Sequence, residues 1–183
     1  YLDGDNGELY YRGYPIEQIA DKSSFTEVMY LLLNGNLPTT DQFAGFEKGI
    51  KKYNFVADEM KRLIDVFPRS AHPMGVLSSL TSALTAFNPK AVDVTSKEDM
   101  DHAAEMLIAK FSHLCAWTYR KKMGLPINHG DDSLNYVENF YKMCFRRPNQ
   151  EFHLDSTVVN ALDKLLILHA DHGGGNNSTF TTH

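Results

Sequence analysis

The sequence of 183 residues predicts an all-α protein that opens with a short β-hairpin. Two observations support this fold class. After the first 15 residues, every strong hydrophobic periodicity is helical, with apolar side chains three or four positions apart. No alternating run rich in Val, Ile or Thr is long enough to indicate a larger sheet.

The chain begins with extended structure and two short helices. Residues 1–14 alternate aromatic and aliphatic side chains around the tight-turn sequence DNG, which predicts a hairpin. Pro15 is suited to a helix start because its missing N–H costs nothing there. A capping-box pattern at Ser24 and Glu27 predicts a second helix that ends at Gly35. The residues expected on its buried face are Phe25, Val28, Met29, Leu32 and Leu33.

Three helices are predicted between Thr39 and Asn88; Pro38 precedes the first and Pro68 closes the second. The first begins at Thr39, the second covers residues 57–67, and the third begins after His72 and ends at Asn88. We interpret His72 as a structural residue near a helix start. The residues expected to be buried are Phe43, Phe46, Ile50, Tyr53, Met60, Leu63, Ile64, Phe67, Val76, Leu77, Leu80, Leu84 and Phe87.

The longest predicted helix covers residues 98–123, capped by Ser96 and stopped by Gly124. Its apolar stripe indicates a central helix, and its small residues allow close approach of neighbouring helices. We interpret His102 and His113 as residues without a functional role. The predicted stripe consists of Met100, Ala103, Ala104, Leu107, Ile108, Phe111, Leu114 and Cys115.

Two more helices complete the prediction. One covers residues 133–145 and is followed by two arginines at 146–147, whose charges suit the C-terminal end of a helix. The last begins at Asp155 or Ser156 and should stop at His172, because three glycines follow and glycine disfavours helix. Its predicted apolar face consists of Val158, Leu162, Leu165, His169 and His172.

The composition excludes several functional classes. The formal net charge is −5 and the Lys and Arg residues are scattered, so no basic stripe is available for the phosphates of nucleic acid. No apolar run approaches the roughly 20 residues of a membrane-spanning helix. Cys115 and Cys144 lie among apolar neighbours in predicted helices, which is typical of buried reduced thiols. We expect a soluble, cytoplasmic protein that binds neither nucleic acid nor membrane.

The candidate site lies where the last helix ends. There the imidazole of His172 adjoins glycine N–H groups and the short polar side chains of residues 176–179, an arrangement suited to binding a small anion. A metal site built on His169 and His172 is one alternative, but the spacing does not match HExxH and related motifs. A second alternative is that both are core histidines with structural hydrogen bonds and no function.

The sequence also resembles a known family at five places, in the family's own order. It is similar to citrate synthases at YLDGDNGELYYRGYPIEQIA, SSFTEVMYLLLNGNLPT, AHPMGVLSSLTSAL, LNYVENFYKMCF and LLILHADHGGGNNSTFTTH. The last segment resembles the family's active-site helix and loop. The resemblance implies a multi-helical portion of the citrate synthase large domain, so that residues 1–183 form a single partial domain of a homo-oligomer, either a dimer or a hexamer.

The resemblance implies an acyltransferase of the tricarboxylic acid cycle. Such an enzyme joins acetyl-CoA to oxaloacetate, forms a carbon–carbon bond, and needs neither a metal nor a further cofactor. His172 would bind oxaloacetate and polarise its ketone oxygen, where negative charge develops in the transition state. Asn176 and Ser178 match loop positions near the substrate, and His169 would support the site without direct catalysis.

Two catalytic groups of the family have no counterpart in the chain. The sequence contains no GP-x-HGGA segment, whose histidine stabilises the acetyl-CoA enol, and it lacks the region of the aspartate that removes the methyl proton. We therefore expect the isolated 183 residues to be inactive and to self-associate through uncovered faces. Two alternatives stay open: a 2-methylcitrate synthase that uses propionyl-CoA, and a helical interaction protein without catalysis.

Overall fold

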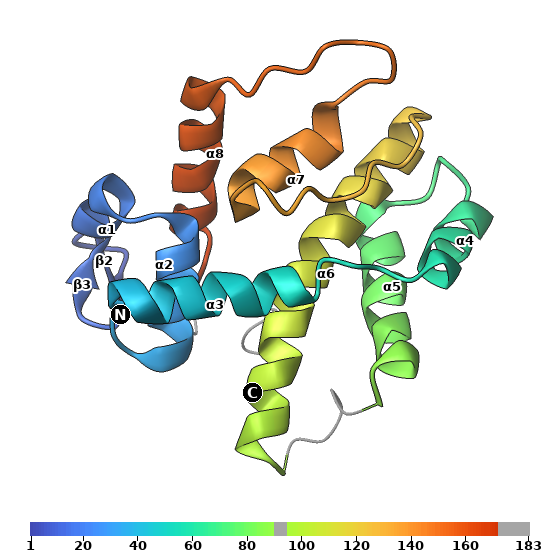
Figure 1. The fold of residues 1–183 in the computed structure, drawn as a ribbon. Coiled ribbons are helices and arrows are strands. Elements are labelled where there is room, and N and C mark those ends of the chain that lie inside the picture. Colours follow the sequence, from blue (N-terminus) through green and yellow to red (C-terminus); the bar gives the residue numbers. More distant parts are fainter. Residues whose placement is uncertain (90–94, 172–183) are drawn as a thin grey trace. The chain divides into compact units, whose positions relative to one another are not determined.

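The computed structural model describes residues 1–89 and 95–171, in which helices predominate, so the all-α prediction is confirmed (Figure 1). The chain divides into two compact units. The first comprises residues 1–47 and 155–183, and the second comprises residues 48–154. The expectation of one partial domain over residues 1–183 stays a prediction.

Three short antiparallel strands open the first unit, in the order β1-β2-β3. The strands are β1 (Leu2–Asp3), β2 (Glu8–Tyr11) and β3 (Tyr14–Pro15). β1 and β2 form the predicted hairpin, and β3 extends it because the chain reverses again directly after Tyr11. Arg12 and Gly13 make this second reversal with positive φ angles of 50° and 90°, a conformation that favours tight hairpin turns.

Four helices follow in the first unit, and their local signals agree with the predictions. They are α1 (Ile16–Lys22), α2 (Phe25–Asn34), α3 (Thr40–Lys52), which continues into the second unit, and α8 (Ser156–Leu168). The capping box of Ser24 and Glu27 is present, and Gly35 ends α2 in the left-handed conformation. α8 packs against α1 and α2. The core of this unit consists of Tyr11, Ile16, Ile19, Val28, Leu31 and Ile167.

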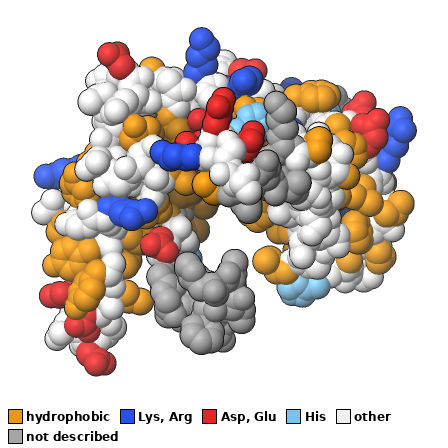
Figure 2. Space-filling model, turned by 90° about the horizontal axis from the view of Figure 1, so that it is seen from below, with side chains coloured by type: hydrophobic (Ala, Val, Ile, Leu, Met, Phe, Trp, Pro, Cys, Tyr) orange, Lys and Arg blue, Asp and Glu red, His pale blue; other side chains and the backbone are white. Residues whose placement is uncertain are grey.

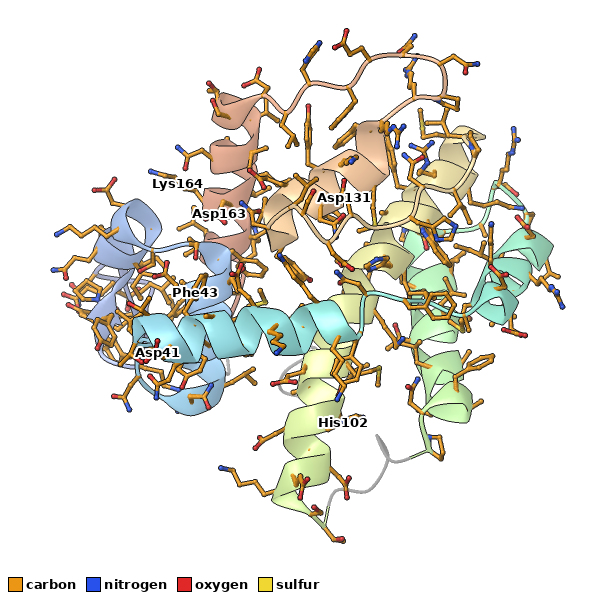
Figure 3. The ribbon with its side chains drawn as sticks, viewed as in Figure 1. Asp41, Phe43, His102, Asp131, Asp163 and Lys164 are labelled. Atoms are coloured by element: carbon orange, nitrogen blue, oxygen red, sulfur yellow. The ribbon has the colours of Figure 1, made fainter. Side chains whose placement is uncertain are left out.

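A carboxylate on α8 ties this helix to the start of α2. Asp163 projects from α8 (Figure 3). The backbone N–H of Phe25 donates to both of its carboxylate oxygens, at 3.1 Å each. This N–H belongs to the first turn of α2, where helices lack internal acceptors. Burial raises the pKa of Asp163, opposed by the hydrogen bond from Phe25. The contact fixes the middle of α8 in the first unit.

The second unit is built around one long helix. Its helices are α4 (Asp58–Val66), α5 (Pro73–Phe87), α6 (Lys97–Met123) and α7 (Tyr136–Phe145). α6 packs against each of the other three, and Ser96 and Gly124 cap it as predicted. His72 has the structural role expected of it, since its Nδ1 accepts the backbone N–H of Met74 at the start of α5. The main core consists of Val56, Met60, Ile64, Val76, Leu80, Leu84, Leu114 and Trp117.

The predicted buried faces are wrong at several positions. On α6, Met100, Leu107 and Phe111 are exposed, and so are Leu33 on α2 and Phe87 on α5. α6 contacts α4, α5 and α7, so its C-terminal half is buried over a broader surface than one stripe provides. Hydrophobic side chains are accordingly visible on the surface in Figure 2. The residues that α6 buries are Met106, Ala109, Ser112, His113, Leu114, Ala116, Trp117, Thr118 and Arg120.

Arg120 on α6 is fully buried and supports the end of α7. Its Nη1 donates to the carbonyl oxygens of Cys144 at 2.9 Å and Arg146 at 2.8 Å, and its Nε donates to the carbonyl of Pro126. The Asn128 amide also donates to the Arg146 carbonyl, at 2.9 Å. The last carbonyls of a helix lack internal donors. A guanidinium from another helix satisfies them here, whereas we had expected the arginines at 146–147 to stabilise this end.

His113 is buried, with 1% of its surface exposed. Its Nδ1 lies 2.9 Å from the carbonyl oxygen of Ala109, and its Nε2 has no hydrogen-bond partner among the described residues. Burial lowers the pKa of His113; the bond to Ala109 opposes this effect, Lys110 and His129 add to it, and Asp132 opposes it. The imidazole is therefore neutral in the folded protein. The interpretation that His113 has no functional role stays a prediction.

This neutral state predicts a loss of stability in acid. The unfolded imidazole takes up a proton near its ordinary pKa of about 6.5, while the folded one resists protonation. The contribution of His113 is therefore complete above that pH and is lost as the pH falls toward the lower folded pKa. Urea unfolding should show a decline of up to about 1.4 kcal/mol per pH unit from this group. The decline should be smaller in His113→Gln, and equal slopes in the two proteins would contradict the prediction.

Both cysteines are free thiols; Cys144 is buried and Cys115 is partly buried. Burial raises the pKa of Cys115 to about 11 and the pKa of Cys144 to about 12. Because the thiolate is the reactive form, we expect both to react with a disulfide reagent at pH 8 about 100-fold more slowly in the folded protein than in urea. Thiol release monitored by absorbance measures this, and rapid labelling of the folded protein would contradict it.

Candidate functional site

The described part of the candidate site is the C-terminal end of α8 and the strand that contacts it. Of the predicted site residues, His172, Asn176 and Ser178 lie outside the described residues. His169 lies within them. The structure therefore describes the chain that precedes the predicted site in sequence, up to Asp171.

α8 starts where the sequence predicts and ends four residues earlier than predicted. The Asp155 side chain caps it by accepting the N–H groups of Thr157 and Val158. Its last helical residue is Leu168, so the prediction that it reaches His172 is wrong. The N–H groups of the next two residues bond to carbonyls three positions back, which tightens the final turn and ends the helix.

His169 is an exposed residue, and its predicted place on a buried face is wrong. Its Nδ1 lies 2.7 Å from the carbonyl oxygen of Leu165, so this nitrogen carries the ring proton and donates it. Val158 and Leu165, predicted on the same face, are 42% and 52% exposed, while Ile167 is fully buried. The reason is that α8 packs against α1 and α2 through the side that carries Asp163 and Ile167.

The end of α8 is held by a tyrosine from β2. The hydroxyl of Tyr11 lies 3.1 Å from the carbonyl oxygen of Ile167 and 3.0 Å from that of Asp171, and it accepts the backbone N–H of Asp171 at 3.2 Å. Tyr11 is 2% exposed, and burial raises its pKa, so the hydroxyl stays protonated. These contacts join residues 156 and 160 positions apart.

An open cavity of about 530 Å³ lies beside the same stretch of backbone. The guanidinium of Arg12 borders it, with Nη2 donating to the carbonyl of Leu32 at 2.8 Å. The cavity lies beside Ala170 and Asp171, directly before His172 in the chain. Our reading of the sequence did not single out Tyr11 or Arg12. The sequence feature that could have indicated them is the polar YRG segment at residues 11–13, which follows the predicted hairpin turn.

The described residues also bear on metal binding and membrane insertion. Across residues 1–89 and 95–171, no group of three or more His, Cys, Asp or Glu side chains is placed to hold a metal ion. The alternative metal ligand His172 lies outside that range. In the same part of the chain, none of the helices combines the length and apolarity needed to cross a membrane.

Comparison with known proteins decides the family. A family model described as the citrate synthase C-terminal domain matches residues 1–183, the whole chain. The chain belongs to the citrate synthase family. Citrate synthase 1 of Mycobacterium tuberculosis is 46% identical over 172 residues, covering 94% of this chain and 40% of that protein. Citrate synthase of Corynebacterium glutamicum is 42% identical over 172 residues, covering 94% and 39%. The chain spans about 40% of the length of these curated citrate synthases.

Solved citrate synthase structures have the same fold. The enzyme from Pyrobaculum aerophilum superposes with a TM-score of 0.83 at 34% identity, over 97% of this chain and 45% of that one. A citrate synthase from Thermoplasma acidophilum, solved as a ternary complex with carboxymethyl coenzyme A and oxaloacetate, gives a TM-score of 0.88 at 26% identity, over 98% and 45%. The resemblance to this family seen in the sequence is confirmed.

Proposed function

We propose that the complete protein condenses acetyl-CoA with oxaloacetate and water to give citrate and CoA, as an acyltransferase of the tricarboxylic acid cycle. The observation that carries this proposal is the family match over residues 1–183, which includes the HADHGGGNNS segment. The Thermoplasma relative was solved with oxaloacetate and a coenzyme A derivative, which supports the same pair of ligands. No metal or further cofactor is needed for this chemistry.

His172 is the proposed contact to the substrate ketone. During condensation the acetyl-CoA methyl carbon bonds to the keto carbon, and the ketone oxygen gains negative charge before it becomes a hydroxyl. An imidazole N–H held at that oxygen stabilises the transition state more than the ground state. Asn176 and Ser178 are proposed to bind substrate from the following loop. His169, whose Nδ1 proton is directed to the Leu165 carbonyl, is proposed to support this loop.

We propose that completion of the reaction needs groups outside residues 1–183. Removal of a methyl proton from acetyl-CoA requires a base, and hydrolysis of the citryl thioester releases CoA. The sequence contains no GP-x-HGGA segment. We therefore propose that the isolated 183 residues are inactive; release of CoA from acetyl-CoA by this polypeptide, dependent on oxaloacetate, would overturn that proposal.

The function is tested on the complete protein with two measurements. Oxaloacetate should raise the thermal unfolding midpoint, because a ligand that binds only the folded state stabilises it. Thiol release from acetyl-CoA should then depend on oxaloacetate. Faster release from propionyl-CoA than from acetyl-CoA would favour a 2-methylcitrate synthase. If oxaloacetate neither stabilises the protein nor supports thiol release, the proposal is contradicted and a helical protein without catalysis is favoured.

A further inference from the structure

The hydroxyl of Tyr11 forms hydrogen-bond contacts between the N-terminal sheet and the backbone at the end of α8. It lies at hydrogen-bond distance from the Ile167 carbonyl and from both backbone polar groups of Asp171. The Ile167 carbonyl belongs to the last turn of α8, where it also accepts the N–H of Ala170 at 3.2 Å. One buried hydroxyl thus serves the end of the helix and the residue three positions beyond it.

These bonds constrain the direction in which the chain leaves α8. The final turn closes with hydrogen bonds from the N–H of His169 to the Leu166 carbonyl and from the N–H of Ala170 to the Ile167 carbonyl. The local hydrogen bonds of the helix therefore end at Ala170. At Asp171 the Tyr11 hydroxyl both receives the N–H and lies 3.0 Å from the carbonyl oxygen. A residue held at both of its backbone groups has little freedom in position. The following peptide bond leads to His172.

We infer that Tyr11 is a positioning residue for keto-acid binding, because it holds the backbone from which His172 extends. This inference rests on the proposed function, in which His172 contacts the ketone oxygen. Transition-state stabilisation by such a donor depends steeply on its placement, and a displacement of about 1 Å can cost 100-fold in rate. Tyr11 touches neither substrate nor reacting atom in this scheme; it acts through the peptide of Asp171.

A purely structural role for Tyr11 is the competing explanation. Its ring belongs to the core of the first unit, with Ile16, Val28 and Leu31. Substitution by phenylalanine keeps the ring in that core and removes only the hydroxyl. A structural role would therefore lower the stability of the protein and leave the ratio of the KM values for oxaloacetate and acetyl-CoA unchanged. A positioning role would act selectively on oxaloacetate.

The test compares Tyr11→Phe with two matched controls in the complete protein. Tyr14→Phe removes a hydroxyl from the neighbouring strand; Tyr14 packs on the same core, and its hydroxyl makes no hydrogen bond within the described part of the chain. Asp163→Asn weakens the tie between α8 and α2 without touching residues 167–171. For each variant we would measure the thermal midpoint, kcat, and KM for oxaloacetate and acetyl-CoA separately.

For Tyr11→Phe we expect KM for oxaloacetate to rise about tenfold and kcat to fall, with KM for acetyl-CoA changed less than twofold. Both controls should keep KM for oxaloacetate close to that of the unmodified protein. An unchanged KM and kcat for Tyr11→Phe would overturn the inference, and so would an equal rise in Asp163→Asn at a similar thermal midpoint. Absence of oxaloacetate-dependent thiol release in the unmodified protein would instead refute the proposed function.

Discussion

Replacing His172 with alanine in the complete protein should lower kcat for citrate formation about 100- to 1000-fold, the cost of removing one donor from a site of developing oxyanion charge. The reason is that the ketone oxygen of oxaloacetate would lose the N–H that stabilises its negative charge during bond formation. Steady-state thiol release with saturating acetyl-CoA and varied oxaloacetate measures the effect.

His169→Gln is the matched control for this prediction. It changes an imidazole three residues earlier in the same motif, one whose Nδ1 proton is already directed to the Leu165 carbonyl. Because His169 is proposed to support the site only, we expect its loss of kcat to be less than about tenfold. An alanine variant at position 172 with nearly unchanged kcat, or a greater loss at His169, would show that the catalytic imidazole has been assigned to the wrong residue.

Arg120→Ala should lower the free energy of unfolding by about 3–5 kcal/mol. The substitution removes donors from the carbonyls of Pro126, Cys144 and Arg146 and leaves a cavity where a fully buried side chain lay. The Arg146 carbonyl keeps the Asn128 amide as a donor, so the cost falls on the carbonyls of Pro126 and Cys144, because a buried acceptor without a donor has given up its hydrogen bonds with water. Urea unfolding followed by circular dichroism measures the loss.

Lys122→Ala provides the control on the same helix. Lys122 is exposed, and removing a single exposed charge typically changes stability by less than about 0.5 kcal/mol. Arg120→Lys separates charge from geometry, since an ammonium cannot present the fixed fork of donors that reaches carbonyls on several sides. We expect it to remain well below the unmodified protein in stability. A lysine variant as stable as the parent would mean that positive charge alone suffices at this place.

The sequence predicted the starts and ends of most helices correctly. The capping box at Ser24 and Glu27, the left-handed glycines at Gly35 and Gly124, and the Asp155 cap all lie where local patterns placed them. These signals act between residues one to four positions apart, so they can be read from the chain itself.

Prediction of the buried faces was less successful. On α6 the expected stripe included Met100, Leu107 and Phe111, which are exposed, while Arg120 is fully buried. Periodicity identifies an apolar side of a helix but not the number or direction of the helices that cover it. A buried arginine has no periodic signal at all, because its acceptors lie 6 to 26 positions away in sequence.

The same division applies to the candidate site. By itself the sequence determined the helical class, the caps and the family resemblance, together with the identity of His172 as the proposed substrate contact. Only the tertiary structure decided that α8 ends at Leu168, that His169 is exposed, and that Tyr11 holds Asp171. Caps and turns depend on neighbours along the chain, whereas the Tyr11 hydroxyl meets its partners 156 to 160 positions away, and such contacts exist only once the chain has folded.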